Sequence, residues 1–205
     1  YYGEEVLHRP LPEGSMYDYL TSCNVDRMDE AALNYFGKKV THRHMQEKID
    51  ACARALTAYG VRAGDAVSLC VLAMPEAVYL LYAINKIGAI ANMLVMNATE
   101  AEIHEKLAVT ESKVVITVNL ALEKIVQASK ETSVKHIIGV SLAESMPCVI
   151  GTLYKWKSKV KQENCVLFSE FLKAGQGKKI DCQEIKADAP AVIAYTGGTT
   201  GKAKG

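Results

Sequence analysis

The sequence has no excess of either charge and no long hydrophobic run. Its 205 residues include 24 Lys and Arg against 23 Asp and Glu, which leaves a formal charge of +1. This balance argues against a strongly basic nucleic-acid-binding protein, so we expect no nucleic-acid partner. No apolar stretch approaches the roughly 18 residues that a membrane span requires. We therefore expect no membrane span and, with 49% hydrophobic residues, a soluble globular chain.

Cysteine pairs of the kind that bind metals or carry redox chemistry are missing. The six cysteines include no CxxC pair, and no histidine lies at zinc-ligand spacing from two of them. An even number could form disulfides, but a chain of this size and apolar content does not need them. We expect free structural thiols in a cytoplasmic protein, with Cys52 and Cys70 buried like small hydrophobic residues. His42 and His44 are expected to have surface or capping roles, and we predict no metal ligand in the chain.

Beyond residue 40 the sequence alternates between helical patterns and short apolar runs. A helix is predicted over 43–59, because apolar residues there fall at spacings of four and three (Met45, Ile49, Cys52, Leu56 and Tyr59). Later apolar runs predict strands at 66–74, 89–96, 114–118 and 136–140. Helices between them are predicted to begin at Pro75, at a capping box of Thr99 and Glu102, and near Leu122. This alternation predicts an α/β fold with a doubly wound, mostly parallel sheet flanked by helices.

Two regions are less regular. Residues 32–36 predict a short strand, followed by a turn at 37–39. Within 141–187, four apolar residues are spaced as on one helix face (Val149, Leu153, Trp156 and Val160). The lysines at 155, 157, 159 and 161 form the most basic patch of the chain. We interpret them as the solvated surface of a helix rather than a nucleic-acid or acidic-lipid site, because the total charge is close to zero.

Residue types suited to binding phosphate are concentrated at the end of the sequence. An apolar strand predicted over 191–195 leads into Thr196–Gly205, which holds four glycines, three threonines and two lysines. Glycines let the backbone curl so that successive N–H groups point at one anion. Threonine hydroxyls add donors, and lysine ammonium groups neutralise charge. Because ligands bind at the carboxyl ends of strands in open α/β sheets, we predict a polyphosphate-binding loop here.

Other glycine-rich motifs fit this segment less well. A P-loop requires G-x-x-x-x-G-K-[ST]. Aligned on Gly201 and Lys202, the first glycine position holds Thr196 and the Mg-binding hydroxyl position holds Ala203. A P-loop phosphotransferase is therefore the weaker interpretation, and the G-x-G-x-x-G spacing of dinucleotide-binding folds is also absent. A flexible Gly/Thr linker would need neither the preceding strand nor the two lysines.

The segment resembles the phosphate loop of the adenylate-forming (AMP-binding) superfamily. The usual form of that loop is Y-T-S-G-T-T-G-x-P-K-G, and residues 195–205 read Y-T-G-G-T-T-G-K-A-K-G. Gly197 stands where the family commonly has Ser, and Ala203 where it has Pro. Less specific likenesses lie in 80–97, which contains N-K-I-G-A and Asn92, and in T-H-R-H-M at 41–45. The resemblance spans the chain from about residue 30 onward.

The resemblance implies activation of a carboxylate by Mg-ATP to an acyl-adenylate, followed by transfer to a thiol, commonly CoA. It implies ATP, Mg and CoA as cofactors, and a small-molecule carboxylate, a fatty or other simple acid, as substrate. The residues that it assigns to the β- and γ-phosphates are Thr196, Gly197, Gly198, Thr199, Thr200, Gly201 and Lys204. Lys202 occupies the variable position of the motif, and no catalytic residue is expected in this chain.

The sequence is expected to be one part of a longer enzyme. It opens on Tyr1 and stops at Gly205, inside the glycine-rich segment. We expect a leading segment (1–40), an α/β lobe (41–190), and a strand with a truncated phosphate loop (191–205). The family's acyl and adenine pockets and its C-terminal domain with the catalytic lysine would lie downstream. The fragment alone is expected to be inactive and could form a homodimer through surfaces that truncation exposes. The alternative is a free-standing, non-catalytic binding or scaffolding domain of the same fold.

Overall fold

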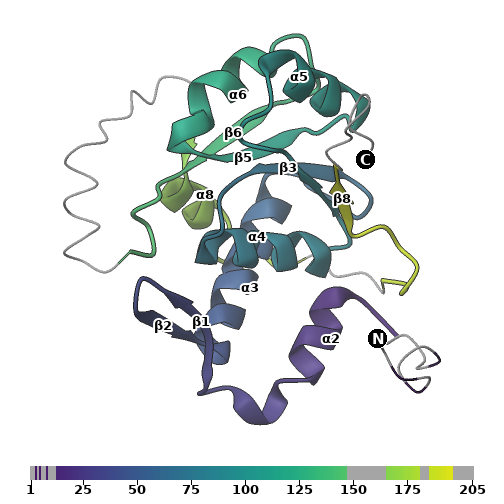
Figure 1. Ribbon diagram of the computed structural model, residues 1–205, viewed down its shortest axis with the longest axis vertical. Helices are drawn as coiled ribbons and strands as arrows, with labels where there is room; N and C mark the ends of the chain where they lie inside the picture. Colours follow the sequence, from purple (N-terminus) through teal and green to yellow (C-terminus); the bar gives the residue numbers. More distant parts are fainter. Residues whose placement is uncertain are drawn as a thin grey trace.

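A parallel β-sheet with helices on both faces forms the centre of the protein (Figure 1). The computed structural model describes residues 3, 5, 8, 13–146, 165–180 and 185–195. Six strands form this sheet in the order β7-β6-β5-β3-β4-β8, and every pairing between neighbours is parallel. The strands are β3 (Ala66–Cys70), β4 (Ile90–Met93), β5 (Val114–Val118), β6 (His136–Val140), β7 (Val166–Leu167) and β8 (Val192–Ala194). The predicted doubly wound α/β fold is confirmed.

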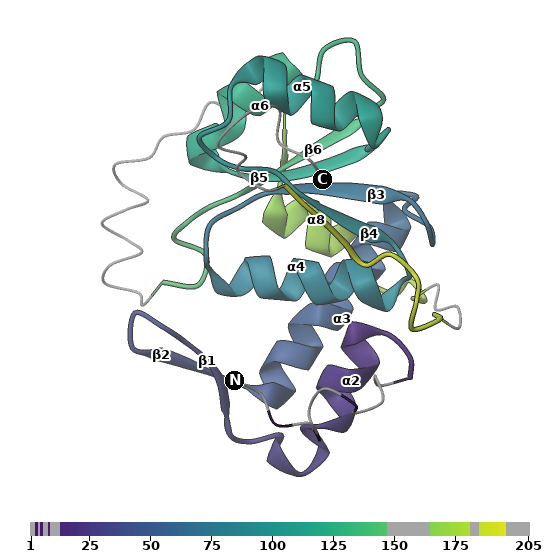
Figure 2. The same ribbon diagram turned by 45° about the vertical axis from the view of Figure 1, so that its right-hand side comes forward.

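The helices divide between the two faces of the sheet. Those on one face are α3 (His42–Ala58), α4 (Pro75–Lys86) and α8 (Phe168–Ala174), and those on the other are α5 (Glu100–Val109) and α6 (Leu122–Ala128) (Figure 2). Helix α4 connects β3 to β4, whereas α5 carries the chain back across β3 to β5. The direction of winding therefore reverses between β3 and β5. This reversal is the topological switch point at which open α/β sheets bind ligands.

The central strands are buried on both faces, which explains why they appear as continuous apolar runs in the sequence. In β3, Val67 and Leu69 pack in the larger core cluster, with α3, α4 and α8. Cys70 belongs to the smaller cluster, with α5 and α6. Both Cys52 and Cys70 are free and fully buried, as expected. Two further described cysteines, Cys23 and Cys165, are also free.

An antiparallel hairpin precedes the sheet. The sequence predicted its first strand but not its second. Its strands are β1 (Ala31–Tyr35) and β2 (Lys38–Thr41). The predicted turn at 37–39 is wrong in its position, because Lys38 and Lys39 already belong to β2. The turn residues are Phe36 and Gly37, whose φ angles are +50° and +83°. Positive φ at both central residues is the geometry of a two-residue hairpin turn, which lets β2 start at once.

The helix α2 (Met16–Ser22), which was not predicted, is attached to the lobe by residues of the N-K-I-G-A stretch. Asn85 Oδ1 accepts a hydrogen bond of 2.8 Å from the backbone N–H of Tyr17. Lys86 Nζ donates to the Tyr17 hydroxyl at 3.0 Å and to Asp50 at 2.5 Å. Desolvation lowers the pKa of Lys86, but its bonds to Asp50 and Tyr17 outweigh this and raise the pKa overall. Asn85 and Lys86 therefore tie α2 to α4 and α3.

The helix ends follow the sequence signals closely. Thr99 Oγ1 accepts from the Glu102 N–H at 3.3 Å, and Glu102 Oε2 accepts from the Thr99 N–H at 2.7 Å, so the capping box of α5 is confirmed. Helix α4 begins at Pro75, as predicted. The strand predicted over 66–74 is shorter, ending at Cys70. The helix predicted around Val149, Leu153, Trp156 and Val160, with its lysines, lies outside the described residues.

We expect Thr99→Ala to lower the free energy of unfolding by about 1 kcal/mol, because it removes the side-chain acceptor at the start of α5. Urea denaturation measures this change. The matched control is Thr57→Ala, since the Thr57 hydroxyl bonds to a carbonyl within α3 and caps nothing. Equal losses in the two variants would contradict a capping role for Thr99.

Candidate functional site

Strand β8 (Val192–Ala194), which directly precedes Tyr195 and the glycine-rich segment in the sequence, ends at the carboxyl edge of the sheet. It pairs in parallel with β4, with Asn92 opposite Ile193 and Met93 opposite Ala194. The strand predicted over 191–195 is thus confirmed as 192–194. The predicted phosphate-binding residues lie outside the described residues, and their roles stay predictions (Thr196, Gly197, Gly198, Thr199, Thr200, Gly201 and Lys204). The described part of the site is the strand end from which this segment continues.

Tyr195, directly after β8, is held by contacts on both its hydroxyl and its ring. The hydroxyl donates to Asn92 Oδ1 at 2.8 Å. The ammonium group of Lys106, from the last turn of α5, lies 4.3 Å from the centre of the ring. Burial raises the pKa of Tyr195, so the phenol keeps the proton that it donates. The residue that opens the phosphate-loop motif is therefore fixed to β4 and α5.

Asn92 belongs to a polar network inside the sheet. Its Nδ2 donates to Ser68 Oγ at 2.7 Å and to Thr110 Oγ1 at 3.2 Å. Ser68 in turn donates to Ser112 Oγ at 2.8 Å, and Ser112 lies 2.8 Å from Thr110. Asn92, Ser68 and Ser112 are fully buried. Sequence reasoning noted Asn92 only as part of a likeness and missed the rest, although a serine and an asparagine inside buried apolar strands were the available signal.

Apolar side chains are exposed along the same carboxyl edge. Leu72 follows β3, Val95 follows β4 and Leu120 follows β5, and they are 42%, 44% and 65% exposed. Beside Leu120, Oδ1 of Asn119 is buried and has no hydrogen-bond partner among the described residues. Leu72 and Leu120 flank the switch point between β3 and β5, and Val95 lies one strand further along, after β4. Exposed apolar side chains and a buried amide oxygen without a partner among the described residues are typical of a surface that contacts a ligand or another part of a protein.

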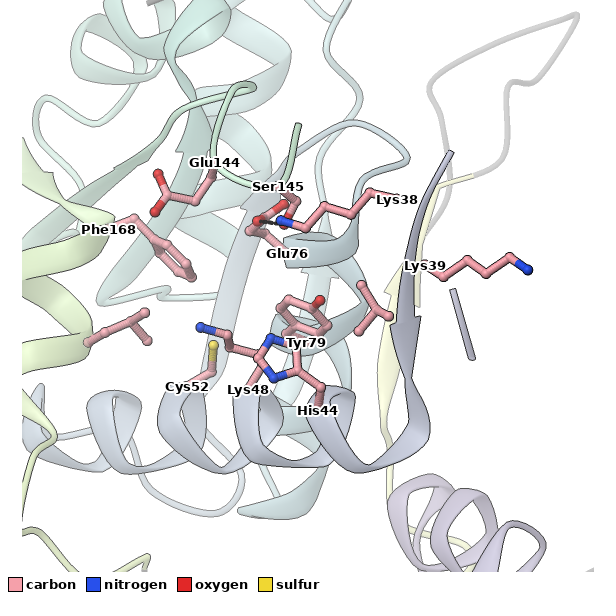
Figure 3. Close-up of a pocket in the computed structure, with 12 residues that line it drawn as sticks. Lys38, Lys39, His44, Lys48, Cys52, Glu76, Tyr79, Glu144, Ser145 and Phe168 are labelled. Atoms are coloured by element: carbon pink, nitrogen blue, oxygen red, sulfur yellow. Dashed lines mark hydrogen bonds between the residues drawn. The ribbon is translucent and has the colours of Figure 1, made fainter. Parts of the chain in front are cut away.

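A pocket lies at the start of α4, between α3, α8 and the β1–β2 hairpin (Figure 3). Its volume is about 160 Å³, and the buried carboxyl of Glu76 faces it. One oxygen of Glu76 accepts from the hydroxyl of Ser145, and the other has no partner among the described residues. Burial raises the pKa of Glu76, against the opposing effect of the Ser145 bond. In Figure 3 the Lys38 side chain extends toward Glu76, whereas Lys39 points away.

Both basic and acidic side chains line this pocket. Lys38, His44 and Lys48 line it together with Glu76 and Glu144, and the walls include Tyr79 and Phe168. Burial and the nearby Glu76 raise the pKa of Tyr79 to about 12. An anion drawn by the lysines would meet the buried carboxyl, so the arrangement does not select one ligand charge.

The two neighbouring histidines have different environments. His44 is exposed, with Nδ1 3.3 Å from a Glu47 oxygen, in keeping with its expected surface role. His42 is buried, and its Nδ1 has no partner among the described residues, so a surface role for His42 is wrong. His42 is the first residue of α3, next to the N-cap Thr41, and its backbone N–H donates to the carbonyl of Glu30 at 3.1 Å, just before β1.

Two classes of feature are not found in the described part of the chain. No group of three His, Cys, Asp or Glu side chains there is arranged to hold a metal ion. No helix within those residues is long and apolar enough to cross a membrane.

Sequence comparison relates almost the whole chain to one group of enzymes. The family described as AMP-binding enzyme matches residues 21–205. A long-chain-fatty-acid–CoA ligase of Bacillus subtilis is 27% identical over 213 residues, which cover 100% of this chain and 38% of the relative. An acetyl-coenzyme A synthetase of Bartonella henselae is 28% identical over 175 residues, which cover 83% of this chain and 26% of the relative.

Structural comparison agrees on the fold. The anthranilate CoA ligase AuaEII, crystallised in complex with anthranoyl-AMP, matches with a TM-score of 0.75 at 21% sequence identity. The match covers 94% of this chain and 34% of that ligase. The chain therefore spans well under half the length of each of these relatives, which is 38% for the Bacillus ligase.

The raised pKa of Glu76 predicts a specific pH dependence of stability. A carboxyl with a raised pKa in the folded state binds its proton more tightly there than in the unfolded chain. That stabilisation is complete below the ordinary Glu pKa of about 4.3 and is lost as the pH rises through the raised value. Glu76→Gln cannot ionise. As the pH rises across this window, the free energy of unfolding of the variant should therefore increase relative to that of the wild type.

Urea denaturation between pH 4 and pH 8 measures the difference. The matched control is Glu123→Gln, an exposed carboxyl on α6, on the opposite face of the sheet. We expect the control to follow the wild-type pH profile. A Glu76→Gln profile parallel to that of the wild type would show that burial does not raise the pKa of this group.

Proposed function

The chain belongs to the AMP-binding enzyme family, and we propose that it is the N-terminal part of an AMP-forming acyl-CoA synthetase. In this proposal the whole enzyme activates a carboxylic acid, a fatty or other simple acid, and transfers it to CoA. The observation that carries the proposal is the phosphate-loop motif, which starts at Tyr195 beyond the carboxyl end of β8. Relatives named as long-chain-fatty-acid and acetyl-coenzyme A ligases support the substrate class.

The residues of the loop fit a polyphosphate by their chemistry. Attack of a carboxylate on the α-phosphorus of ATP builds negative charge on the leaving pyrophosphate. Backbone N–H groups of glycines, threonine hydroxyls and the Lys204 ammonium would stabilise that charge. The described structure supports this role, because the fixed Tyr195 starts the loop at the ligand-binding edge of the sheet. Lys106, over the Tyr195 ring, adds a positive charge beside the start of the loop.

The remaining parts of the reaction would depend on residues outside this chain. We propose that the acid, adenine and Mg²⁺ sites and the catalytic lysine belong to the rest of a longer protein, so that these 205 residues alone are inactive. The exposed Leu72, Val95 and Leu120 would face that remainder or, in the isolated piece, a second copy. We propose a cytoplasmic location for the whole enzyme.

ATP–pyrophosphate exchange on the full-length gene product, with a panel of carboxylic acids, tests the proposed function. We expect exchange that depends on one class of acid, because adenylate formation is reversible and releases pyrophosphate. A folded protein without exchange for any acid would instead support the alternative, a non-catalytic binding or scaffolding domain of the same fold.

The placement of the loop predicts unequal effects for its two lysines. In the full-length enzyme, Lys204→Ala should lower the exchange rate by about 100-fold, the usual effect of removing one oriented charge-stabilising group. Lys202→Ala, the matched control at the variable position of the motif, should lower it by less than about tenfold. Equal losses for the two variants would mean that the motif is aligned wrongly on this sequence.

A further inference from the structure

The buried network behind Tyr195 has a single consistent order of donors and acceptors. Thr110 Oγ1 donates its one hydrogen to the backbone carbonyl of Lys106 at 2.8 Å. In the 2.8 Å contact between Thr110 and Ser112, the donor must therefore be Ser112. Ser112 then has no hydrogen left for Ser68, so Ser68 donates to Ser112. Each of the three hydroxyl hydrogens has one assigned acceptor.

This order fixes the orientation of the Asn92 amide. The hydrogens of Ser68 and Thr110 are already used, so both hydroxyl oxygens can only accept from Asn92. The Nδ2 group faces them, at 2.7 Å and 3.2 Å. A flipped amide would place Oδ1 against two oxygens that have no hydrogen to give. Oδ1 is consequently held toward β8, where it accepts the hydroxyl hydrogen of Tyr195.

The bond between Asn92 and Tyr195 acts where the sheet itself provides little restraint. Strand β8 has only three residues, and among the described residues it pairs with β4 alone. Its last paired residue is Ala194, opposite Met93. Tyr195 follows immediately, and its hydroxyl reaches back to a side chain that is completely buried. The side-chain bond thus attaches the chain to β4 one residue beyond the last paired residue of β8.

We propose that Asn92 is a positioning residue for the phosphate-binding loop, which it orients by holding Tyr195 at the end of β8. The inference rests on the proposed function, since it assigns the loop its role. Lys106 cooperates from the other side, because its ammonium group lies over the ring whose hydroxyl Asn92 binds. Rigid elements of the core, β3, β4 and the end of α5, thereby determine the direction in which the loop starts.

The test is Tyr195→Phe in the full-length gene product, because it deletes the hydroxyl and leaves the ring, and its packing under Lys106, in place. The matched control is Tyr17→Phe, which also removes one tyrosine hydrogen bond, to Lys86, but far from β8 along the chain. We expect Tyr195→Phe to raise the KM for ATP in pyrophosphate exchange about fivefold, the effect of one hydrogen bond of ordinary net strength. Tyr17→Phe should leave this KM within about twofold of the wild type.

Hydrogen–deuterium exchange supplies a readout that does not depend on catalysis. In Tyr195→Phe, amide exchange in a peptide covering residues 191–205 should be faster than in the wild type, and in Tyr17→Phe it should be unchanged. If the wild type shows no pyrophosphate exchange, the proposed function fails, and the deuterium measurement alone decides the positioning role. Unchanged amide exchange in Tyr195→Phe would overturn that role, whatever the enzyme's activity.

A double-mutant cycle separates the role of Asn92 from general support of the fold. If Asn92 acts on the loop through Tyr195, Asn92→Ala should raise the KM for ATP in the wild type but add nothing in the Tyr195→Phe background. Additive effects would overturn the inference for Asn92. If Asn92→Ala does not fold, Ser112→Ala takes its place, since Ser112 orders the network without touching Tyr195.

Discussion

Burial of β3 on both faces is the constraint on which the rest of the structure depends. Its neighbours β4 and β5 pair with it in parallel, so the chain must cross from one edge of the sheet to the other through helices. Val67 and Leu69 then require α3 and α4 on one face, and Cys70 requires α5 and α6 on the opposite face. The switch point between β3 and β5 follows from this arrangement, and open α/β sheets bind ligands at such points.

Polar atoms inside such a sheet are stable only when every donor and acceptor is matched. The network of Ser68, Asn92, Thr110 and Ser112 meets that condition, and it uses its remaining acceptor to bind Tyr195. Glu76 presents the opposite case, since one of its buried oxygens has no partner among the described residues. We infer that the first arrangement positions the start of the proposed phosphate loop, and we expect the second to make stability depend on pH.

Local signals in the sequence were sufficient for most elements of the lobe. The capping box of Thr99 and Glu102, the proline that opens α4 and the limits of β5 and β6 were predicted correctly, because each depends on residues a few positions apart. Helix α2 was missed although Ser15 and Asp18 form a capping box at its start, because it has no buried apolar face and is bonded to the lobe through the distant Asn85 and Lys86. The hairpin turn was predicted at 37–39 and lies at 36–37, because Phe36 adopts a positive φ that side chains rarely take.

The sequence by itself determined the fold class and the family likeness, because apolar periodicity and the glycine-rich motif are written in contiguous residues. Only the tertiary structure decided the strand order, the burial of His42 and the partners of Asn92. Those partners lie 18 residues away at Thr110, 24 at Ser68 and 103 at Tyr195. No local pattern specifies such pairs, because they meet only when parallel strands bring distant segments into register.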